Sequence, residues 1–364
     1  MKKLTAFLLG FVMLFSFAEA ADISSAYKAA AEYIKKTASD PQVSSIGGEW
    51  AVIGIARSEA ADDAYFEKYY NNAKNYIKEC GGILSNNKYT EYSRVSLALS
   101  AIGKDPRNVE GYNLLTPLGD YKKTVRQGLN GAIWALIALD SKNYEIPENP
   151  GAEIRATREM YIEKILSGEG EGGGWSLFGE GDSEADITAM ALCALRPYGS
   201  DERVKKAQER ALEFLSAAQN ENGGYICYGA ENSESCAQVI TALCALGIPE
   251  TDSRFIKNGK TLSDNLLSFY NGDGSFSHIK GGGANQMATE QAFYALAALK
   301  RFNSGESFLY DLTDEKKEDK TLAAAEKLKY FSRVMKIFGN INYDESKGLP
   351  LYFVPMPREM SEIK

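Results

Sequence analysis

Three stretches of the sequence repeat one pattern, and this pattern decides the fold. Residues 172–175 read GGGW and lead to SEADITAMALCAL at 183–195. Residues 223–225 read GGY and lead to SESCAQVITALCAL at 233–246, and residues 272–276 read GDGSF and lead to QMATEQAFYALAAL at 286–299. The glycines at 174, 224 and 274 are each 50 residues apart. A fixed period of this length predicts a fold built from stacked supersecondary units.

Weaker copies of the pattern lie upstream, at 47–56, 81–101 and 127–139. In each unit an amphipathic segment precedes the glycine turn. In 204–218, for example, apolar residues recur at helical spacing with charged residues between them. The segment after the turn is small and apolar nearly all round, so it should be buried on more than one side. Each unit therefore predicts an outer amphipathic helix followed by an inner buried helix.

We expect twelve helices in six such pairs. The outer helices are predicted at 22–38, 64–79, 113–125, 152–167, 200–218 and 252–270. The inner helices are predicted at 47–58, 89–103, 127–140, 183–196, 233–247 and 286–302. This alternation predicts an all-α fold, an α6/α6 toroid in which parallel inner helices are ringed by outer ones. An open superhelical solenoid is the alternative, and the lack of obvious polar capping repeats favours closure.

The ends of the chain have a different character. Lys2, Lys3, an apolar run at 8–17 and the small-x-small pattern at 18–20 predict a secretory signal peptide at 1–20. A membrane anchor is the alternative, although the run is too short to span a bilayer comfortably. Residues 21–310 should form the toroid. Residues 311–364 are predicted to form a charged amphipathic helix and a proline-containing tail, which either packs on the barrel or contacts a partner.

Charge and cysteine content exclude some classes of function. The full chain carries −8 and residues 1–20 carry +1, so the mature chain carries −9. An acidic protein of this kind is not expected to bind nucleic acid. Five cysteines are few for a secreted disulfide scaffold. Cys227 and Cys236 flank a short loop and are candidates for pairing, whereas Cys193 and Cys244 are interpreted as small core residues. His278 is the only histidine, so a histidine-rich metal site is excluded. No metal and no cofactor are expected.

The segment before the second glycine turn resembles a known repeat. Residues 210–219, RALEFLSAAQ, with the following glycine turn resemble the QW repeat of squalene and terpenoid cyclases. Phe214, Gln219 and Gly223 match that repeat, and Tyr225 stands where the family has Trp. In the neighbouring units Trp175 keeps the Trp, while Gly274 and Phe276 match in part. The resemblance implies that these residues are structural rather than catalytic.

Over residues 22–310 the chain is similar to secreted prenyltransferase/squalene-oxidase-repeat proteins of Gram-positive bacteria, within the superfamily of terpenoid cyclases and protein prenyltransferases. The resemblance implies a toroid located in the cell envelope or the medium. The catalytic motif of alkene-protonating cyclases has its nearest match at 184–189, EADITA, where Asp186 takes the place of the proton donor. Glu184 and Ile187 replace the flanking aspartates of that motif. An alkene requires a strong acid tuned by close polar partners, so Asp186 is interpreted either as a helix-start residue or as a residual donor.

Other chemistries on this fold find less support. The Asp/Cys/His zinc set of prenyltransferases does not assemble, and the Gly-Cys-Gly-Glu-Gln thioester sequence is absent. Tyr92 with Arg94, and Arg126, are candidates for the basic patch of a polysaccharide lyase, but their spacing is not diagnostic.

Polar residues gather where the inner helices are expected to begin. Parallel inner helices place all their amino-terminal ends, with free N–H groups, at one mouth of the barrel. The residues predicted there are Glu49, Trp50, Tyr89, Glu91, Tyr92, Arg94, Arg126, Gln127, Asn130, Glu184, Asp186, Glu234, Gln238, Gln286, Thr289 and Glu290. We expect them to form a concave polar and aromatic pocket; the alternative is that they are caps and solvated rim residues.

Three functions fit this pattern. The favoured hypothesis is a non-catalytic extracellular binding module whose ligand is a small hydrophobic molecule, a corrinoid, a glycan fragment or a protein segment. The second is a divergent cyclase or a polysaccharide lyase, with a deep aromatic cavity in the first case and a basic groove in the second. The third is a structural or adhesive surface protein.

Overall fold

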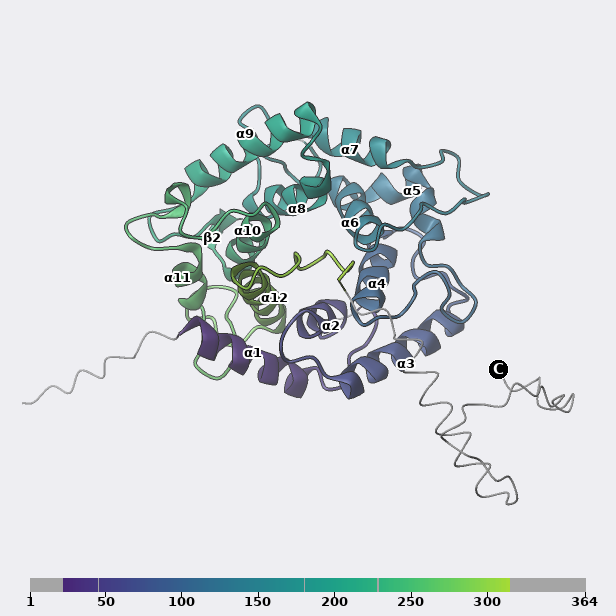
Figure 1. Cartoon of the computed structure of the whole chain (residues 1–364), viewed down its shortest axis with the longest axis horizontal. Helices are drawn as coiled ribbons and strands as arrows, with labels where there is room; N and C mark the ends of the chain where they lie inside the picture. The colour runs from purple at the N-terminus through teal and green to yellow at the C-terminus, as the bar shows by residue number, and fades with distance from the viewer. Residues whose placement is uncertain (1–21, 45, 180, 228, 315–364) are drawn as a thin grey trace, which may run out of the picture. The chain divides into compact units, whose positions relative to one another are not determined.

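The computed structural model describes residues 22–314 except Ser45, Glu180 and Tyr228. Their twelve α-helices form two concentric rings (Figure 1), which confirms the predicted all-α toroid. Two strands of two residues each, β1 (Ile226–Cys227) and β2 (Ala230–Glu231), pair as a small hairpin. The predicted signal peptide and the predicted helix and tail after residue 314 lie outside the described residues. Within the described part, no helix is both long and apolar enough to cross a membrane.

The two rings contain alternating helices of the chain (Figure 1). The outer ring consists of α1 (Ile23–Thr37), α3 (Asp63–Glu79), α5 (Tyr121–Thr124), α7 (Arg158–Leu166), α9 (Glu202–Ala218) and α11 (Leu262–Leu267). The inner ring consists of α2 (Glu49–Ala56), α4 (Thr90–Ala101), α6 (Leu129–Asp140), α8 (Ala185–Leu195), α10 (Ser233–Ala245) and α12 (Gln286–Asn303). Four short 3₁₀ turns lie at Thr116–Gly119, Val125–Gln127, Arg196–Tyr198 and Ser253–Phe255.

Composition explains which helix goes to which ring. In α6 every residue from Gly131 to Leu139 is buried, because outer helices cover one side and the barrel interior covers the other. In α9 only one face is buried, as its alternating apolar and charged residues require. Side-chain caps fix several starts: Thr157 accepts a hydrogen bond from the Met160 N–H at α7, and Asn232 accepts one from the Ser235 N–H at α10.

Two outer helices are much shorter than predicted, and α7 begins six residues later than the predicted 152, because Thr157 caps its start. The segment predicted as one helix at 113–125 contains a 3₁₀ turn and the single turn α5, because Pro117 and Gly119 interrupt it. The segment predicted at 252–270 is divided into a 3₁₀ turn and α11. Asn258 and Gly259 both take positive φ angles, 50° and 74°, which a continuous helix does not allow. Both segments do belong to the outer ring, as their amphipathic pattern predicts. The helix-breaking residues within them nevertheless divide each segment into shorter pieces.

The ring is closed by contacts between its first and last units, so the solenoid alternative is excluded. Gly274, in the last glycine turn, packs on α1 with a φ of 97°. A Cβ atom there would lie 2.5 Å from the carbonyl oxygen of Ala29. Gly223 and Gly173 pack in the same way against the backbone near the start of α11 and against that of α9. Each glycine turn therefore meets the next outer helix, and the last meets the first.

The carboxyl-terminal end of the inner ring is covered by residues 304–314, which follow α12 and cross the middle of the ring in Figure 1. Leu309, Tyr310 and Leu312 are buried, and the Leu312 N–H donates to the Ser141 carbonyl at 2.8 Å. Arg57, at the end of α2 and only 3% exposed, donates to the carbonyl oxygens of Leu309 and Asp311 at 3.1 and 2.9 Å. We call residues 304–314 the closing segment.

Candidate functional site

The amino-terminal ends of the inner helices meet at one end of the barrel, which we call the amino end. Hydrogen bonds between polar groups connect neighbouring helices there. Glu49 of α2 binds Arg94 of α4 at 2.9 Å, and the Thr90 N–H of α4 donates to the Gln127 side chain before α6 at 3.1 Å. The Ser233 N–H of α10 donates to the His278 carbonyl at 3.1 Å. Most of the predicted site residues therefore lie at this end of the barrel, whereas Trp50 and Gln238 contact the aromatic rings at its centre.

Glu49 is inside the protein rather than on the rim. Its carboxylate accepts hydrogen bonds from the Ser44 N–H at 2.7 Å, from the Tyr69 hydroxyl at 3.2 Å and from Arg94 Nε at 2.9 Å. Burial raises the pKa of Glu49, and the Arg94 guanidinium opposes this rise. Glu49 thus fixes the loop before α2 and positions Arg94, which is half-buried.

Glu290 has a similar role on α12. It accepts hydrogen bonds from the Gly47 N–H at 2.8 Å and from Gln286 Nε2 at 2.9 Å, and the Thr37 hydroxyl donates to Gln286. Burial raises the pKa of Glu290 to about 7. Both buried carboxylates therefore hold the same loop, residues 43–48, against the ring.

Several other predicted residues also fasten loops. Thr289 accepts a hydrogen bond from the Phe276 N–H at 2.9 Å. Tyr89 and Tyr92 are buried against each other with ring centroids 5.2 Å apart. The Ser44 hydroxyl donates to Glu91 at 3.4 Å. Asn130 is half-buried at the start of α6, and Arg126 is exposed nearby.

Three acidic residues, Glu184, Asp186 and Glu234, lie at the starts of α8 and α10, and we call them the acidic trio. Asp186 and Glu234 are close enough for the Glu234 charge to add to the rise that burial causes in the pKa of Asp186. Cys227 Sγ contacts Asp186 Oδ1 at 3.8 Å. His278 Nδ1 lies 2.8 Å from Glu234 Oε2. The trio is half-buried and so remains partly open to solvent.

Cys227 and His278 were not predicted as site residues. They reach the acidic trio from the β1–β2 hairpin and from the loop before α12. Burial, with Asp186 and Glu184, raises the pKa of Cys227 to about 11, so its thiol stays protonated near neutral pH. All five cysteines are free, so the pairing of Cys227 with Cys236 is not formed. The Cys236 thiol is instead buried and donates to the Leu262 carbonyl.

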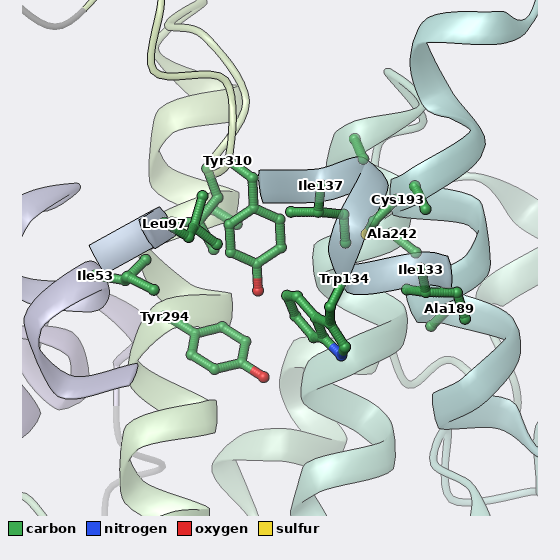
Figure 2. Close-up of a cluster of buried hydrophobic side chains, with 14 of the residues drawn as sticks. Ile53, Leu97, Ile133, Trp134, Ile137, Ala189, Cys193, Ala242, Tyr294 and Tyr310 are labelled. Atoms are coloured by element: carbon green, nitrogen blue, oxygen red, sulfur yellow. The ribbon is translucent and has the colours of Figure 1, made fainter. Parts of the chain in front are cut away.

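Aromatic rings fill the centre of the barrel below the amino end. Trp50 lies with its ring centroid 4.8 Å from that of Trp134 and 6.1 Å from that of Tyr294. Gln238 donates to the Tyr294 hydroxyl. Tyr310 of the closing segment reaches Trp134 from the other end, 5.8 Å between centroids. Figure 2 shows Tyr310, Tyr294 and Trp134 gathered at the centre with Leu97 and Ile53 nearby. The described interior is therefore occupied by the protein's own side chains.

Large exposed apolar side chains concentrate at the amino end. Six of the eight that are described lie in the loops or the first turn that lead into inner helices: Ile46, Ile83, Phe178, Ile226, Ile279 and Met287. Phe178 is 70% exposed and Ile226 is 63% exposed. The other two, Tyr112 and Ile154, lie in long loops that lead into outer helices. The amino end thus presents apolar as well as acidic groups to solvent.

A cavity of about 420 Å³ lies at the opposite end of the barrel. It is bounded by Tyr310 and Asp311 of the closing segment and by the carboxyl-terminal ends of α6 and α8. Arg158 binds Asp140 there at 2.8 Å, and Arg196 lies 3.5 Å from Asp311. Sequence reasoning missed this cavity because it assigned residues after 310 to a separate tail.

The residues of the QW-like repeat make equivalent contacts in successive units. Trp175 Nε1 donates to the Ile165 carbonyl at 2.7 Å, and the Tyr225 hydroxyl donates to the Leu215 carbonyl at 3.0 Å, in each case ten residues upstream. Gln219 Nε2 donates to the carbonyl oxygens of Gly223 and Phe255, both at 2.9 Å. Phe276 is buried at the corresponding position, and Phe214 is half-buried. These side chains fasten the glycine turns to the outer helices.

Comparisons with known proteins identify the fold and no family. No family model matches the chain, and no curated protein matches its sequence. Among solved structures, Candida albicans protein geranylgeranyltransferase-I complexed with GGPP superposes with a TM-score of 0.52 at 14% identity, covering 84% of this chain and 98% of that one. Unsaturated glucuronyl hydrolase from Bacillus sp. GL1, which is responsible for the degradation of glycosaminoglycan, superposes with a TM-score of 0.50 at 14% identity, covering 79% of this chain and 98% of that one. Both likenesses concern the toroid alone.

Proposed function

We propose that this chain is a non-catalytic binding module whose contact surface is the amino end of its barrel. The observation that carries the proposal is the concentration of exposed apolar side chains on loops leading into five of the six inner helices. Contiguous exposed apolar patches mark interaction sites, and these side chains share one end of the barrel, with one or two on each loop. We also propose that the protein acts outside the cell, on the basis of the signal peptide predicted at 1–20.

The frame beneath this surface is suited to binding. Buried Glu49 and Glu290 hold the loop before α2 through backbone N–H groups, and Glu49 also orients Arg94. A binding surface on a fixed frame loses little conformational entropy when a partner docks. The amino end therefore offers exposed contact groups on loops that are already ordered by buried hydrogen bonds.

The cyclase alternative is weakened on two grounds. A raised pKa makes Asp186 a weaker acid, which is the opposite of what alkene protonation requires. The centre of the barrel is also filled by Trp134, Tyr294 and Tyr310, where a cyclase would hold its substrate. The lyase alternative is weakened because Arg94 is bound to Glu49 and the neighbouring helix starts carry acidic residues.

One observation favours hydrolysis of a glycosidic bond as a second candidate function. Burial and the nearby Glu234 charge raise the pKa of Asp186, which favours its protonated form. Most glycosidases use a pair of carboxyl groups, one of which acts as the acid. Incubation with neutral and uronic aryl glycosides tests it. Turnover that Asp186→Asn abolishes at unchanged melting temperature would replace the binding proposal by this one.

Site-specific photo-crosslinking tests the binding proposal directly. A benzophenone side chain is placed at Ile226 in one protein and at Ile154 in another, and each is exposed to the extracellular proteins and wall fragments of its host. The Ile226 probe should form a discrete adduct that Phe178→Ser removes, because both side chains belong to the same surface. Equal adducts from both probes, or none from Ile226, would rule the proposal out.

A further inference from the structure

We propose that the partner of the amino end is a protein segment that presents Lys or Arg next to apolar residues. This inference rests on the proposed function and names the partner's chemistry. It is carried by the α8–α12 side of the amino end, where acidic and apolar groups share the same loops. We call Phe178, Ile226, Ile279 and Met287 the apolar rim.

The loops on this side are strongly acidic. Residues 167–186, which lead into α8, contain six acidic residues and no Lys or Arg. Residues 219–234, which lead into α10, contain three acidic residues and again no Lys or Arg. Arg210 pairs with Glu169, Lys280 pairs with Glu231 and His278 contacts Glu234, so side chains outside these two loops interact with at least three of their nine acidic residues. The surface therefore carries an excess of negative charge on two consecutive loops of the ring.

Two members of the apolar rim lie on the loops that carry the acidic trio, and the other two lie in the loop before α12 and in its first turn, which reach the trio through His278. Phe178 precedes α8, whose start carries Glu184 and Asp186. Ile226 lies in the hairpin that precedes α10, whose first turn carries Glu234. Ile279 follows His278, the residue that contacts Glu234 from the α12 side. A partner that covers the rim is thus brought against the trio.

The negative charge of the loops and the span of the apolar rim together indicate the class of partner. Complementary charge favours a cation and disfavours acidic glycans, nucleic acids and anionic lipids. The apolar rim extends over three consecutive loops, whereas a small amine contacts only one or two groups. Lys and Arg carry apolar stems beneath their charged heads, so a peptide containing them contacts the rim and the trio at once. Aromatic and aliphatic neighbours in the peptide would cover Phe178 and Ile226.

Selection from a random peptide library tests the inference with partners of unbiased sequence. A library of random linear peptides is displayed on phage and selected on the full chain, because short segments carry the common modes of peptide recognition. Enriched peptides are synthesised, and their dissociation constants are measured by calorimetry. Three proteins are compared: the native chain, the charge variant Glu184→Gln/Asp186→Asn/Glu234→Gln and the rim variant Phe178→Ser/Ile226→Ser.

The expected result has three parts. Enriched peptides contain Lys or Arg beside aromatic or aliphatic residues, and the charge variant binds them at least about tenfold more weakly. The dissociation constant on the native chain rises severalfold between low and high salt, because exposed charges are screened. The salt series needs no variant, so it remains decisive if the triple substitution fails to fold.

Two different results would overturn the two proposals separately. Neutral or acidic peptides whose binding requires the rim but not the trio would overturn the cationic partner and leave the binding surface intact. Peptides that bind the rim variant as well as the native chain would overturn the proposed function and this inference with it. No enrichment at all would overturn the peptide partner, and the crosslinking experiment would then decide the binding surface.

Discussion

The two ends of the barrel have opposite character. At the carboxyl end, Arg57 and Arg301 bind the closing segment, and Tyr310 inserts its ring into the core. At the amino end, loops leave Phe178 and Ile226 in solvent and keep buried carboxylates whose pKa values are raised. The carboxyl end is therefore covered by the protein's own segment, whereas the amino end leaves apolar side chains in solvent, which a stable fold does not need. This difference is the main reason to place the function at the amino end.

Arg57→Ala should have the largest effect on stability, because Arg57 makes most of the hydrogen bonds that hold the closing segment at the carboxyl end. Three or more hydrogen bonds from one buried cation to the closing segment are lost, which should lower the free energy of unfolding by about 4 kcal/mol. Urea denaturation measures the loss. Arg126→Ala, at an exposed arginine of the amino end, is the control and should change stability by less than about 0.5 kcal/mol. Similar losses in both variants would break the comparison.

Two substitutions of Tyr310 distinguish what its ring and its hydroxyl group contribute to the stability of the closing segment. Tyr310→Ala leaves a cavity between Trp134 and Phe308 and should lower the free energy of unfolding by about 3 kcal/mol. The Tyr310 hydroxyl is buried, with no hydrogen-bond partner among the described residues. Tyr310→Phe should therefore leave stability unchanged or raise it slightly, since an unsatisfied polar group is removed. A large loss in the Phe variant would show that the hydroxyl has a function.

Glu290 should make the amino end pH-dependent. Its pKa in the folded protein is about 7, above the ordinary 4.5, so the folded state binds more protons than the unfolded state between these values. Stability should consequently fall by about 2 kcal/mol as pH rises from about 5 to 8. Glu290→Gln keeps an acceptor for the Gly47 N–H and should remove most of this fall. Denaturation curves at both pH values measure it, with the exposed Glu67→Gln as control. An unchanged slope in Glu290→Gln would assign the dependence to another group.

Ile226→Ser should have the smallest effect on stability. It tests most directly whether the amino end contributes to binding rather than to the stability of the fold. The side chain is 63% exposed, so the free energy of unfolding should change by less than about 0.5 kcal/mol. Binding of the peptides selected above should nevertheless weaken. Ile154→Ser, the same change at an exposed site in the loop before α7, should leave both stability and binding as they are. Melting temperature and calorimetry on the two variants report the two properties.

The inner helices lie close to their predicted bounds, whereas several outer helices are shorter than the sequence pattern predicts. Each inner helix follows a glycine turn and is small and apolar over most of its length, so its position is well marked. At 113–125 and 252–270 the amphipathic pattern continued across breakers such as Pro117 and Gly259, and a pattern of apolar spacing alone does not show where a helix stops. Helix existence was therefore easier to predict than helix length.

The site was predictable in position and less so in detail. Parallel inner helices bring Glu49, Asp186 and Glu290 to one end, and this follows from topology alone. Whether a carboxylate there faces solvent depends on the fold of the adjacent loop, which covers Glu49 and Glu290 and leaves Asp186 partly open. Residues 304–310 were assigned to the toroid without a role and residues 311–314 to the tail, although Phe308, Leu309, Tyr310 and Leu312 give the closing segment an apolar character. That apolar cluster was the available signal.

Closure of the ring also constrains how the chain can fold. Arg57 binds carbonyl groups more than 250 residues further along the chain, and Gly47 binds Glu290 across nearly the same distance. Contacts of such long sequence separation form late, because the loop they close must first lose its conformational entropy. A nascent chain can pair its early helices. The contacts between the first and last units of the ring cannot form until the residues up to 314 have been synthesised. Once completed, the ring has no terminal repeat that can fray, and the six units should unfold in a single cooperative step.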